Sequence, residues 1–377
     1  MPTSSNAART PAVRTFAVQA STGSYSVGIG TGLLQQMLDT DGDRVFLVDA
    51  YLQAPFIAAG LDPIVVVADE PAKSLDRMTD IIVQLRERRA TRNTTLVAVG
   101  GGVIQDIAAF AASTYMRGID WVYVPTTLLS MTDSCIGGKS SINVGIYKNI
   151  VGTFHPPVEV LIDPSFVATL SHEQRAAGLC EAAKICLCRN TSEFDAYLAA
   201  RPSVEADETT LVAVIDRSLR GKKWFIEVDE FDKGERLLLN FGHTFGHAIE
   251  AATTFAVSHG IAVGLGMFTA FRLGEAMGRD YSNAPSIAPF RAHVTELLGA
   301  VDGLPEALGM ATVSSLMDAF ESDKKHTRDH YAVIVARVDG VIERLMLPRD
   351  AATRTMIEQA FARLLSDHAR SGMLVSA

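Results

Sequence analysis

The sequence predicts an α/β domain with a parallel sheet, followed by a mainly helical domain. Before about residue 170, short apolar runs rich in β-branched residues alternate with helical patterns. Beyond that point helical patterns dominate, and we see no internal repeat or low-complexity linker. We therefore expect a flexible tail over residues 1–14, an α/β domain over 15–170 and a helical domain over 171–370.

Four apolar runs predict the buried strands of the sheet. They read RVFLVDA, PIVVVAD, TTLVAVG and WVYVPTT, and helical patterns such as TGLLQQML and SLDRMTDIIVQLRERR accompany them along the chain. Parallel strands need a crossover connection, usually a helix, so this alternation favours a parallel sheet.

The second half opens with a helix start signal. Ser171 followed three residues later by Gln174 is a capping-box pattern, and it predicts a helix over SHEQRAAGLCEAAKICLCR. The main strand signal in this half is HYAVIVARVDG.

Composition and charge exclude several classes of partner. The chain has 377 residues, 48% of them hydrophobic and 20% charged, which is typical of a soluble globular protein. A net charge of −9 argues against nucleic acid or an anionic membrane as the main partner, because either would require a basic face. No apolar run reaches the ~18 residues of a membrane span, and the start MPTSSNAARTPAVR lacks the apolar segment of a secretory signal.

The cysteines indicate a reducing compartment. Cys135, Cys180, Cys186 and Cys188 show no C-x-x-C zinc spacing, and we expect small buried thiols in a cytoplasmic protein.

A glycine run follows the third strand pattern. Gly100, Gly101 and Gly102 lie between TTLVAV and a helical segment, where backbone N–H groups and a helix N-terminus suit a dinucleotide pyrophosphate. The run is not G-x-G-x-x-G, and a tight turn is the alternative. Asp106 suits the same site or a solvated helix face, and Asp49, at the end of a strand, suits a ribose hydroxyl.

A second glycine pair occurs in PTTLLSMTDSCIGGKSSINVGIYKN. The sequence Gly-Gly-Lys-Ser is typical of phosphate loops, but the spacing G-x-x-x-x-G-K-[ST] fails because Asp133 occupies the first glycine position. Lys139 is then either a phosphate-binding residue or an exposed surface lysine.

Three histidines lie in LLLNFGHTFGHAIEAATTFAVSHG. His243 and His247 are four residues apart and share a helix face, and with His259 they are candidate ligands of a divalent metal. Glu181 lies in an apolar helical segment, where a nearby cation would offset the cost of burying its charge. Lys184 is an alternative partner for Glu181, so the residues alone leave a metal site and a buried histidine cluster both open.

These motifs together resemble the 3-dehydroquinate synthase family and, more broadly, the sugar phosphate cyclases. The segments that carry the resemblance are GGGVIQD, MRGIDWVYVPTTLLSMTDSCIGGKSSIN, KNIVGTFHPP, GLCEAAK and LLLNFGHTFGHAIE with SHG. They occur in the family's order from about Asp49 to Lys325. The resemblance implies a Rossmann-like NAD-binding domain, a helical metal-binding domain and a homodimer.

The resemblance also implies a role for each matching residue. Glu181, His243 and His259 would hold the metal, usually Zn²⁺ with Co²⁺ as an alternative, and His247 would serve proton transfer near the substrate phosphate. Residues that would line the substrate pocket are Arg117, Lys139, Asn149, Lys184, Lys222, Arg236, Asn240 and one of Lys324 or Lys325. Residues that would contact NAD⁺ are Asp49, Glu70, Lys73, Gly101, Gly102, Asp106, Thr126, Thr127, Asp133, Lys148 and Thr169.

The implied activity is that of a carbon–oxygen lyase acting on a phosphate ester. NAD⁺-dependent cyclisation of a heptulosonate phosphate, with loss of phosphate, would give 3-dehydroquinate. Lys222 and Arg236 match the positions that serve the substrate carboxylate. A cyclase of specialised metabolism, of the amino-dehydroquinate, epi-valiolone or deoxy-inosose type, is the alternative. A metal-dependent alcohol or glycerol dehydrogenase and an inactive binding protein are further alternatives.

Two positions depart from the family pattern. Ile261 stands where an acidic residue is usual after His-Gly, and it would remove polar support from His259. Glu235 stands where an apolar residue is usual, and it would compete for Arg236 or Lys222.

Overall fold

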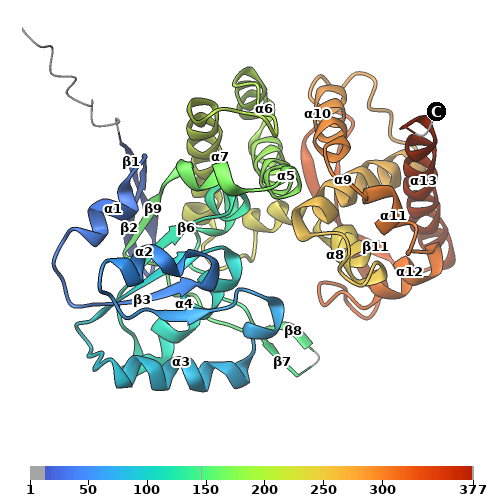
Figure 1. Cartoon of the computed structure of the whole chain (residues 1–377). Helices are drawn as coiled ribbons and strands as arrows, with labels where there is room; N and C mark the ends of the chain where they lie inside the picture. The colour runs from blue at the N-terminus through green and yellow to red at the C-terminus, as the bar shows by residue number, and fades with distance from the viewer. Residues whose placement is uncertain (1–12, 146, 376–377) are drawn as a thin grey trace, which may run out of the picture. The chain divides into compact units, whose positions relative to one another are not determined.

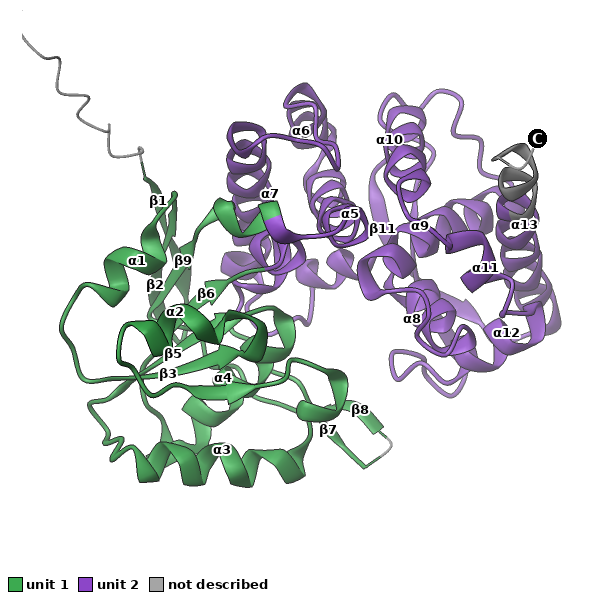
Figure 2. Cartoon of the chain, viewed as in Figure 1, with its two compact units in different colours: residues 1–126, 138–168 green, residues 127–137, 169–377 purple. Residues whose placement is uncertain are grey.

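The computed structural model describes residues 13–145 and 147–375 and divides the chain into two compact units. Unit 1 comprises Met1–Thr126 and Gly138–Ala168, and unit 2 comprises Thr127–Gly137 and Thr169–Ala377 (Figures 1 and 2). Of the expected tail, residues 1–12 lie outside the described residues, and Arg14 begins the first strand.

Unit 1 is built on a seven-stranded sheet in the order β1-β2-β9-β6-β5-β3-β4. Every neighbouring pair is parallel except β1 with β2, so the prediction of a parallel sheet is confirmed with one antiparallel edge strand that the sequence analysis did not foresee. The strands are β1 (Arg14–Ala20), β2 (Gly23–Ile29), β3 (Arg44–Asp49), β4 (Ile64–Val66), β5 (Thr95–Gly100), β6 (Trp121–Pro125) and β9 (Glu159–Ile162).

The four apolar runs of the sequence form β6, β5, β3 and β4, which are consecutive in the sheet, with β4 at its edge. Their alternate residues, such as Val97 and Val99, pack in one buried cluster with Phe46 and Phe56. The helices are α1 (Leu33–Leu38), α2 (Gln53–Ala58), α3 (Leu75–Glu87) and α4 (Gly102–Thr114), joined by 3₁₀ turns η1 (Ala50–Leu52), η2 (Glu70–Ala72), η3 (Tyr115–Arg117) and η5 (Pro164–Thr169). A hairpin of β7 (Ile142–Val144) and β8 (Tyr147–Val151) carries the Gly-Gly-Lys-Ser region.

Unit 2 is mainly helical, as predicted. Its α-helices are α5 (His172–Arg189), α6 (Thr191–Ala199), α7 (Glu208–Val228), α8 (His243–Ala252), α9 (His259–Ala276), α10 (Ile287–Gly299), α11 (Leu304–Leu308), α12 (Val313–Glu321) and α13 (Ala351–Val375). Shorter turns are the π-helical η4 (Ser130–Ser134) and the 3₁₀ turn η6 (Glu235–Asn240), and the predicted strand β10 (His330–Ala336) pairs with β11 (Ile342–Pro348). The capping box at the start of α5 is confirmed, since Ser171 and Gln174 bond each other's backbone N–H.

Glycines bring the helices of unit 2 into backbone contact. A Cβ atom at Gly266 of α9 would lie 2.0 Å from the carbonyl oxygen of Gly242 and 2.6 Å from the nitrogen of Gly246. A Cβ atom at Gly260 would lie 2.5 Å from the carbonyl oxygen of Ala177 in α5. The glycines therefore let α5, α8 and α9 approach one another closely, and His243 and His259 begin two of these helices.

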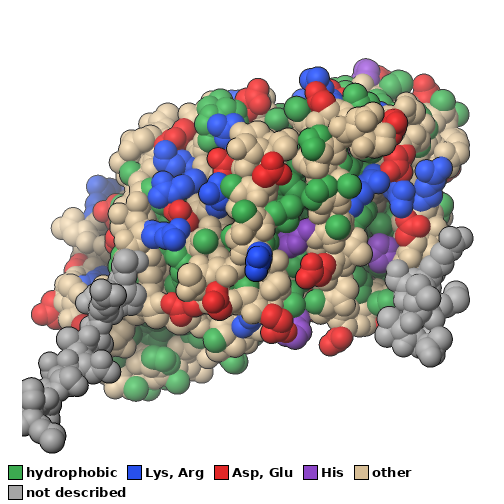
Figure 3. Space-filling view, turned by 90° about the horizontal axis from the view of Figure 1, so that it is seen from above, with side chains coloured by type: hydrophobic (Ala, Val, Ile, Leu, Met, Phe, Trp, Pro, Cys, Tyr) green, Lys and Arg blue, Asp and Glu red, His purple; other side chains and the backbone are tan. Residues whose placement is uncertain are grey.

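Among the described residues, no helix is both long and apolar enough to cross a membrane. The four cysteines are free and buried. Acidic, basic and hydrophobic side chains are interspersed on the face that Figure 3 shows, with histidine side chains reaching the surface.

Candidate metal centre and neighbouring sites

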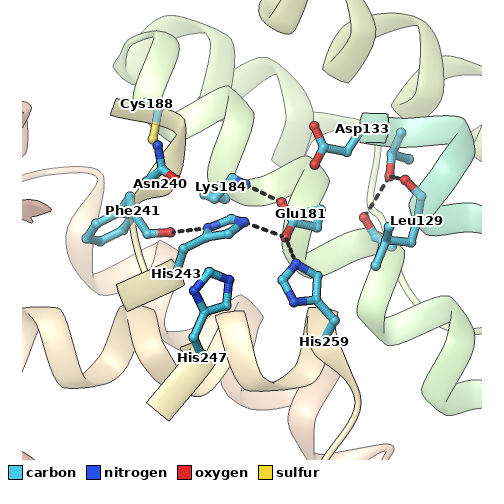
Figure 4. Close-up of polar contacts among 12 residues, drawn as sticks. Leu129, Asp133, Glu181, Lys184, Cys188, Asn240, Phe241, His243, His247 and His259 are labelled. Carbon is cyan, nitrogen blue, oxygen red and sulfur yellow. Dashed lines mark hydrogen bonds and ion pairs between the residues drawn. The ribbon is translucent and has the colours of Figure 1, made fainter. Parts of the chain in front are cut away.

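Three helices of unit 2 bring Glu181, His243 and His259 together. Oε1 of Glu181 lies 3.7 Å from Nε2 of His243 and 3.8 Å from Nε2 of His259 (Figure 4). Glu181 lies in the middle of the buried α5, whereas the two histidines are the first residues of α8 and α9. One atom from each of these three residues could bind the same ion, because the three atoms lie within 4.8 Å of one another.

The remaining polar atom of each of these three side chains already has a partner. Oε2 of Glu181 accepts a hydrogen bond from the buried Lys184 ammonium. Nδ1 of His243 lies 3.4 Å from the carbonyl oxygen of Phe241, and Nδ1 of His259 lies 3.1 Å from Oε2 of Glu250. These contacts orient Oε1 of Glu181 and both Nε2 atoms toward a common point.

This donor set fits a divalent cation. Oε1 of Glu181 is buried and has no hydrogen-bond partner among the described residues, which is costly for a carboxylate unless a cation lies beside it. Burial raises the pKa of Glu181 even though Lys184 opposes the shift. Burial also lowers the pKa of His243, which favours the neutral imidazole that a metal requires. One carboxylate and two imidazoles are a ligand set typical of zinc.

His247 lies beside this cluster without joining it. Its ring centroid is 5.7 Å from that of His243, and its Nδ1 atom is 3.5 Å from Oδ2 of Asp323 and 3.5 Å from Nζ of Lys325. Lys325 also contacts Asp323 at 3.2 Å, whereas the Lys324 side chain is exposed. Of the two candidate lysines, Lys325 is therefore the one next to His247.

The cations expected to bind the substrate carboxylate are buried in unit 2. Nζ of Lys222, in α7, lies 2.7 Å from Oδ1 of Asp133 and donates to the carbonyl oxygen of the same residue at 2.6 Å. Burial opposes ionisation of Asp133, but Lys222 outweighs it and lowers the pKa of that carboxyl. The Arg236 guanidinium donates to the carbonyl oxygens of Glu230 and Gly137.

The two departures from the family pattern have different surroundings. Ile261 is fully buried in α9 and has no polar side-chain atom. The Glu250 carboxylate is the polar partner of His259. The Glu235 side chain is exposed, whereas the Arg236 side chain is buried and bonded to backbone carbonyls.

In unit 1, the glycine run ends β5 and begins α4. Gly101 is the N-cap residue, no side chain caps the first turn, and no heavy atom lies within 4 Å of a Cβ atom built on Gly102. Open space in front of an uncapped helix N-terminus fits the pyrophosphate of a dinucleotide.

A polar cluster lies near this helix. Nζ of the buried Lys73 is 3.0 Å from Oδ2 of Asp106 and 2.8 Å from Oδ1 of Asn149, and Oδ1 of Asp106 accepts a hydrogen bond from the backbone of Ser141. These contacts hold the β7–β8 hairpin against α4. The structure thus joins Asn149, which we expected near the substrate, to two residues expected near NAD⁺.

Arg117 has an unusual backbone. Arg117 (φ 70°) and the preceding Met116 (φ 48°) both adopt left-handed conformations. Such conformations are uncommon and strained for residues with side chains, and strained residues cluster at functional sites. The Arg117 side chain is exposed in unit 1.

The other expected site residues occur in both units. Asp49 accepts a hydrogen bond from the backbone of Tyr51, Glu70 accepts one from Asn143, and Asn240 donates to the carbonyl oxygen of Leu237. Unit 1 also holds Thr126, Lys139 and Lys148, and unit 2 holds Thr127 and Thr169.

Two carboxylates next to the candidate site were missed from the sequence. Glu250 contacts His259, and Asp323 contacts His247. A spacing signal for Glu250 was present, because it lies two helical turns beyond His243 and therefore on the same face of α8.

Two of the pockets in the described structure differ in their relation to the candidate metal centre. One of about 290 Å³ is lined by the hairpin region of unit 1, including Lys139, Asn149 and Phe154. A larger one of about 660 Å³ lies in unit 2 between α9, α10, α11 and α13 and contains none of the metal-cluster residues. Donor atoms, rather than pocket size, therefore identify the metal centre.

Comparison with known proteins finds matches over most of the chain. The sequence model of "3-dehydroquinate synthase N-terminal" matches residues 63–177, and that of "3-dehydroquinate synthase C-terminal" matches residues 178–326. A 3-dehydroquinate synthase from Xylella fastidiosa (strain 9a5c) is 37% identical over 360 residues, covering 88% of this chain and 89% of that protein.

Solved structures share the fold. A 2-deoxy-scyllo-inosose synthase complexed with carbaglucose-6-phosphate, NAD⁺ and Co²⁺ matches with a TM-score of 0.80 at 22% identity, over 93% of this chain and 100% of that one. ValA, a 2-epi-5-epi-valiolone synthase from Streptomyces hygroscopicus subsp. jinggangensis 5008 with NAD⁺ and Zn²⁺ bound, matches with a TM-score of 0.75 at 25% identity, over 91% and 97%. The matches to both parts of the family and to a full-length relative show that the chain belongs to the 3-dehydroquinate synthase family.

Proposed function

We propose that this chain is a 3-dehydroquinate synthase, a carbon–oxygen lyase that cyclises 3-deoxy-arabino-heptulosonate phosphate with loss of phosphate. The observation that carries the proposal is the unpartnered Oε1 atom of Glu181, which faces Nε2 of both His243 and His259. Membership in the family and the 37% identical relative support the same activity.

The chain's residues suit two bound groups, a divalent metal and NAD⁺. When bound, the nicotinamide would remove and return a hydride, and the metal, Zn²⁺ or Co²⁺, would polarise a substrate oxygen. Glu181, His243 and His259 would hold the metal. The glycine turn before α4 would hold the pyrophosphate of NAD⁺, with Asp49 at the end of β3 as a ribose acceptor.

His247 would carry the proton transfer. Burial lowers the pKa of its imidazole, so the ring is neutral at pH 7 and can accept a proton. Asp323 and Lys325 lie on its Nδ1 side and would fix the ring, leaving Nε2 for the substrate.

Cations would position the substrate's two anionic groups. Lys222 and Arg236 would bind the carboxylate. For Lys222, the substrate carboxylate would share the ammonium with Asp133. Arg117, Lys139 and Lys325 would be cations for the phosphate, and Asn149, Lys184 and Asn240 would also line the substrate pocket. Holding both ends restricts the substrate to a reactive conformer.

The remaining NAD⁺ contacts of the proposal come from residues around these groups. They are Glu70, Lys73, Gly101, Gly102, Asp106, Thr126, Thr127, Asp133, Lys148 and Thr169. In unit 1 the bonds between Lys73, Asp106 and the hairpin would keep the loop that borders the cofactor in place.

The four free, buried thiols suit a reducing compartment, and we propose a cytoplasmic protein on that ground. The family resemblance supports a homodimer.

Substrate comparison tests the activity. The zinc-loaded protein and NAD⁺ are given the heptulosonate phosphate, sedoheptulose 7-phosphate or glucose 6-phosphate, and phosphate release and NADH absorbance are followed. Phosphate release from the heptulosonate phosphate alone, without lasting NADH, is expected. Turnover of a sugar phosphate without a carboxylate would indicate a cyclase of specialised metabolism. Lasting NADH without phosphate release would indicate a dehydrogenase.

A further inference from the structure

Glu250 occupies a position next to the candidate metal centre that the proposed activity does not use. Its Oε2 atom lies 3.1 Å from Nδ1 of His259, and the opposite ring nitrogen, Nε2, lies 3.8 Å from Oε1 of Glu181. The imidazole of His259 is therefore placed between two carboxylates, one on each side of the ring.

We propose that Glu250 is a positioning residue for the metal ligand His259. By accepting the Nδ1–H hydrogen bond, Glu250 selects the tautomer in which Nε2 carries a free lone pair, and it directs that lone pair toward Glu181 and His243. The negative charge also makes the imidazole a stronger donor, as carboxylate partners of zinc-bound histidines do.

The connection between α8 and α9 supports this role. Glu250 lies near the end of α8, and His259 is the first residue of α9. Between them, Thr254 (φ 50°) and Phe255 (φ 63°) both adopt left-handed backbone conformations, and the Phe255 N–H donates to the Glu250 carbonyl oxygen at 2.7 Å. Such conformations are costly for residues with side chains, so this turn holds the two residues at a defined separation against local preference.

Burial and sequence context support it as well. The Glu250 side chain is 15% exposed and the His259 side chain is 40% exposed, so their contact is partly shielded from water. Ile261, two residues after His259, is apolar and fully buried, so it offers His259 no polar partner. In this chain Glu250 therefore supplies the carboxylate that contacts His259.

A different role for Glu250 must be separated from this one. Donor atoms of His247, Glu250 and His259 also lie within 4.8 Å of one another, so Glu250 could instead bind an ion directly. A direct ligand and a positioning residue differ in what their removal does to the coordination of the metal.

Metal binding without substrate tests the inference. Zinc affinity is measured by competition with a chelator for the full chain and for Glu250→Gln, Glu250→Ala and the exposed control Glu296→Gln, and the visible spectra of the Co²⁺ forms are recorded. Glu250→Ala is expected to lower zinc affinity about 10- to 100-fold. Glu250→Gln keeps an oxygen acceptor and should lose less, the control should match the wild type, and every Co²⁺ spectrum should keep the same coordination number.

Two results would overturn the proposal: wild-type zinc affinity in both Glu250 variants, or a Co²⁺ spectrum for Glu250→Gln that shows a lost ligand. If Glu250→Ala does not fold, the zinc affinity and the Co²⁺ spectrum of Glu250→Gln alone test the proposal. The inference rests on the proposed function only for the presence of the metal. A wild-type protein that binds zinc but releases no phosphate would refute the proposed function. The zinc affinities of the variants would still test whether Glu250 positions His259.

Discussion

The buried Lys184 ammonium donates a hydrogen bond to one oxygen of the buried Glu181 carboxylate, one helical turn away on α5. Only the other oxygen remains for the histidine side of the cluster. Lys184 therefore leaves Glu181 a single oxygen as a candidate ligand atom. The same ion pair compensates the buried charge of the carboxylate and fixes the orientation of that oxygen.

Lys184→Met should make the fold more dependent on metal. Removing one partner of a buried ion pair typically costs about 3–5 kcal/mol because the other charge is left uncompensated. A metal beside Glu181 would restore a cation, so zinc should raise the melting temperature of the variant more than that of the wild type. Thermal unfolding with zinc and with chelator measures this, with the more exposed Lys223→Met as control. An equal zinc effect in all three proteins would argue against a metal beside Glu181.

Gly266→Ala should weaken metal binding. The new Cβ atom would lie 2.0 Å from the Gly242 carbonyl oxygen, so α8 and α9 must separate and carry His243 away from His259. We expect about a tenfold or larger loss of zinc affinity, which is the range for changes that disturb ligand orientation. Gly299→Ala is the control, because no heavy atom lies within 4 Å of its Cβ position. Wild-type zinc affinity in Gly266→Ala would show that the helix contact does not set the ligand geometry.

Lys222→Met should impair use of a carboxylate-bearing substrate. Losing a buried cation that binds an anion costs about 2–5 kcal/mol, so kcat/KM for the heptulosonate phosphate should fall at least about 30-fold. Asp133 also loses its partner, so circular dichroism must show that the variant is folded. The neighbouring Lys223→Met should keep wild-type kcat/KM. If Lys222→Met also keeps wild-type kcat/KM, Lys222 does not bind the substrate carboxylate.

His293 should make unfolding depend on pH. Burial lowers the pKa of this imidazole to about 4, and its Nε2 atom lies 2.8 Å from the Tyr197 hydroxyl. The unfolded state takes up a proton near the ordinary pKa of 6.5, which the folded state resists. The stabilisation is thus complete above pH 6.5 and is lost as the pH falls toward 4.

Between pH 7.5 and 5 the wild type should lose about 2 kcal/mol more stability than His293→Gln. Urea unfolding of the metal-free protein at both pH values measures the difference, with the exposed His330→Gln as control. If His293→Gln and the wild type show the same pH dependence, folding does not lower the pKa of this histidine.

The sequence predicted the elements that carry regular patterns. Apolar runs separated by helical patterns predicted strands β3 to β6, and Ser171 with Gln174 predicted the start of α5. The edge strand β1 was missed because most of its residues are exposed or half-buried, so it lacks the apolar run of a buried strand, although it forms a tight hairpin with β2. The π-helical turn that presents Asp133 to Lys222 was missed for a similar reason, since no local residue pattern marks such a turn.

At the site, residue types predicted the chemistry but not all the contacts. The sequence left open whether Glu181 pairs with Lys184 or with a cation, and the structure shows that each oxygen faces a different partner. Glu250 and Asp323 were missed because the residues around a carboxylate in the sequence do not show whether it is solvated or lies beside a histidine. Only the turn between α8 and α9 and the approach of the segment after α12 bring them to His259 and His247.

The zinc content of His259→Ala tests the central claim most directly. Wild-type protein and variant are loaded with zinc, dialysed against a weak chelator and analysed by atomic absorption, with His330→Ala as control. The account predicts one zinc per chain in the wild type and the control, and loss of most of it in His259→Ala while the helical circular dichroism is retained. A folded His259→Ala protein that keeps its full zinc would contradict a metal held by Glu181, His243 and His259.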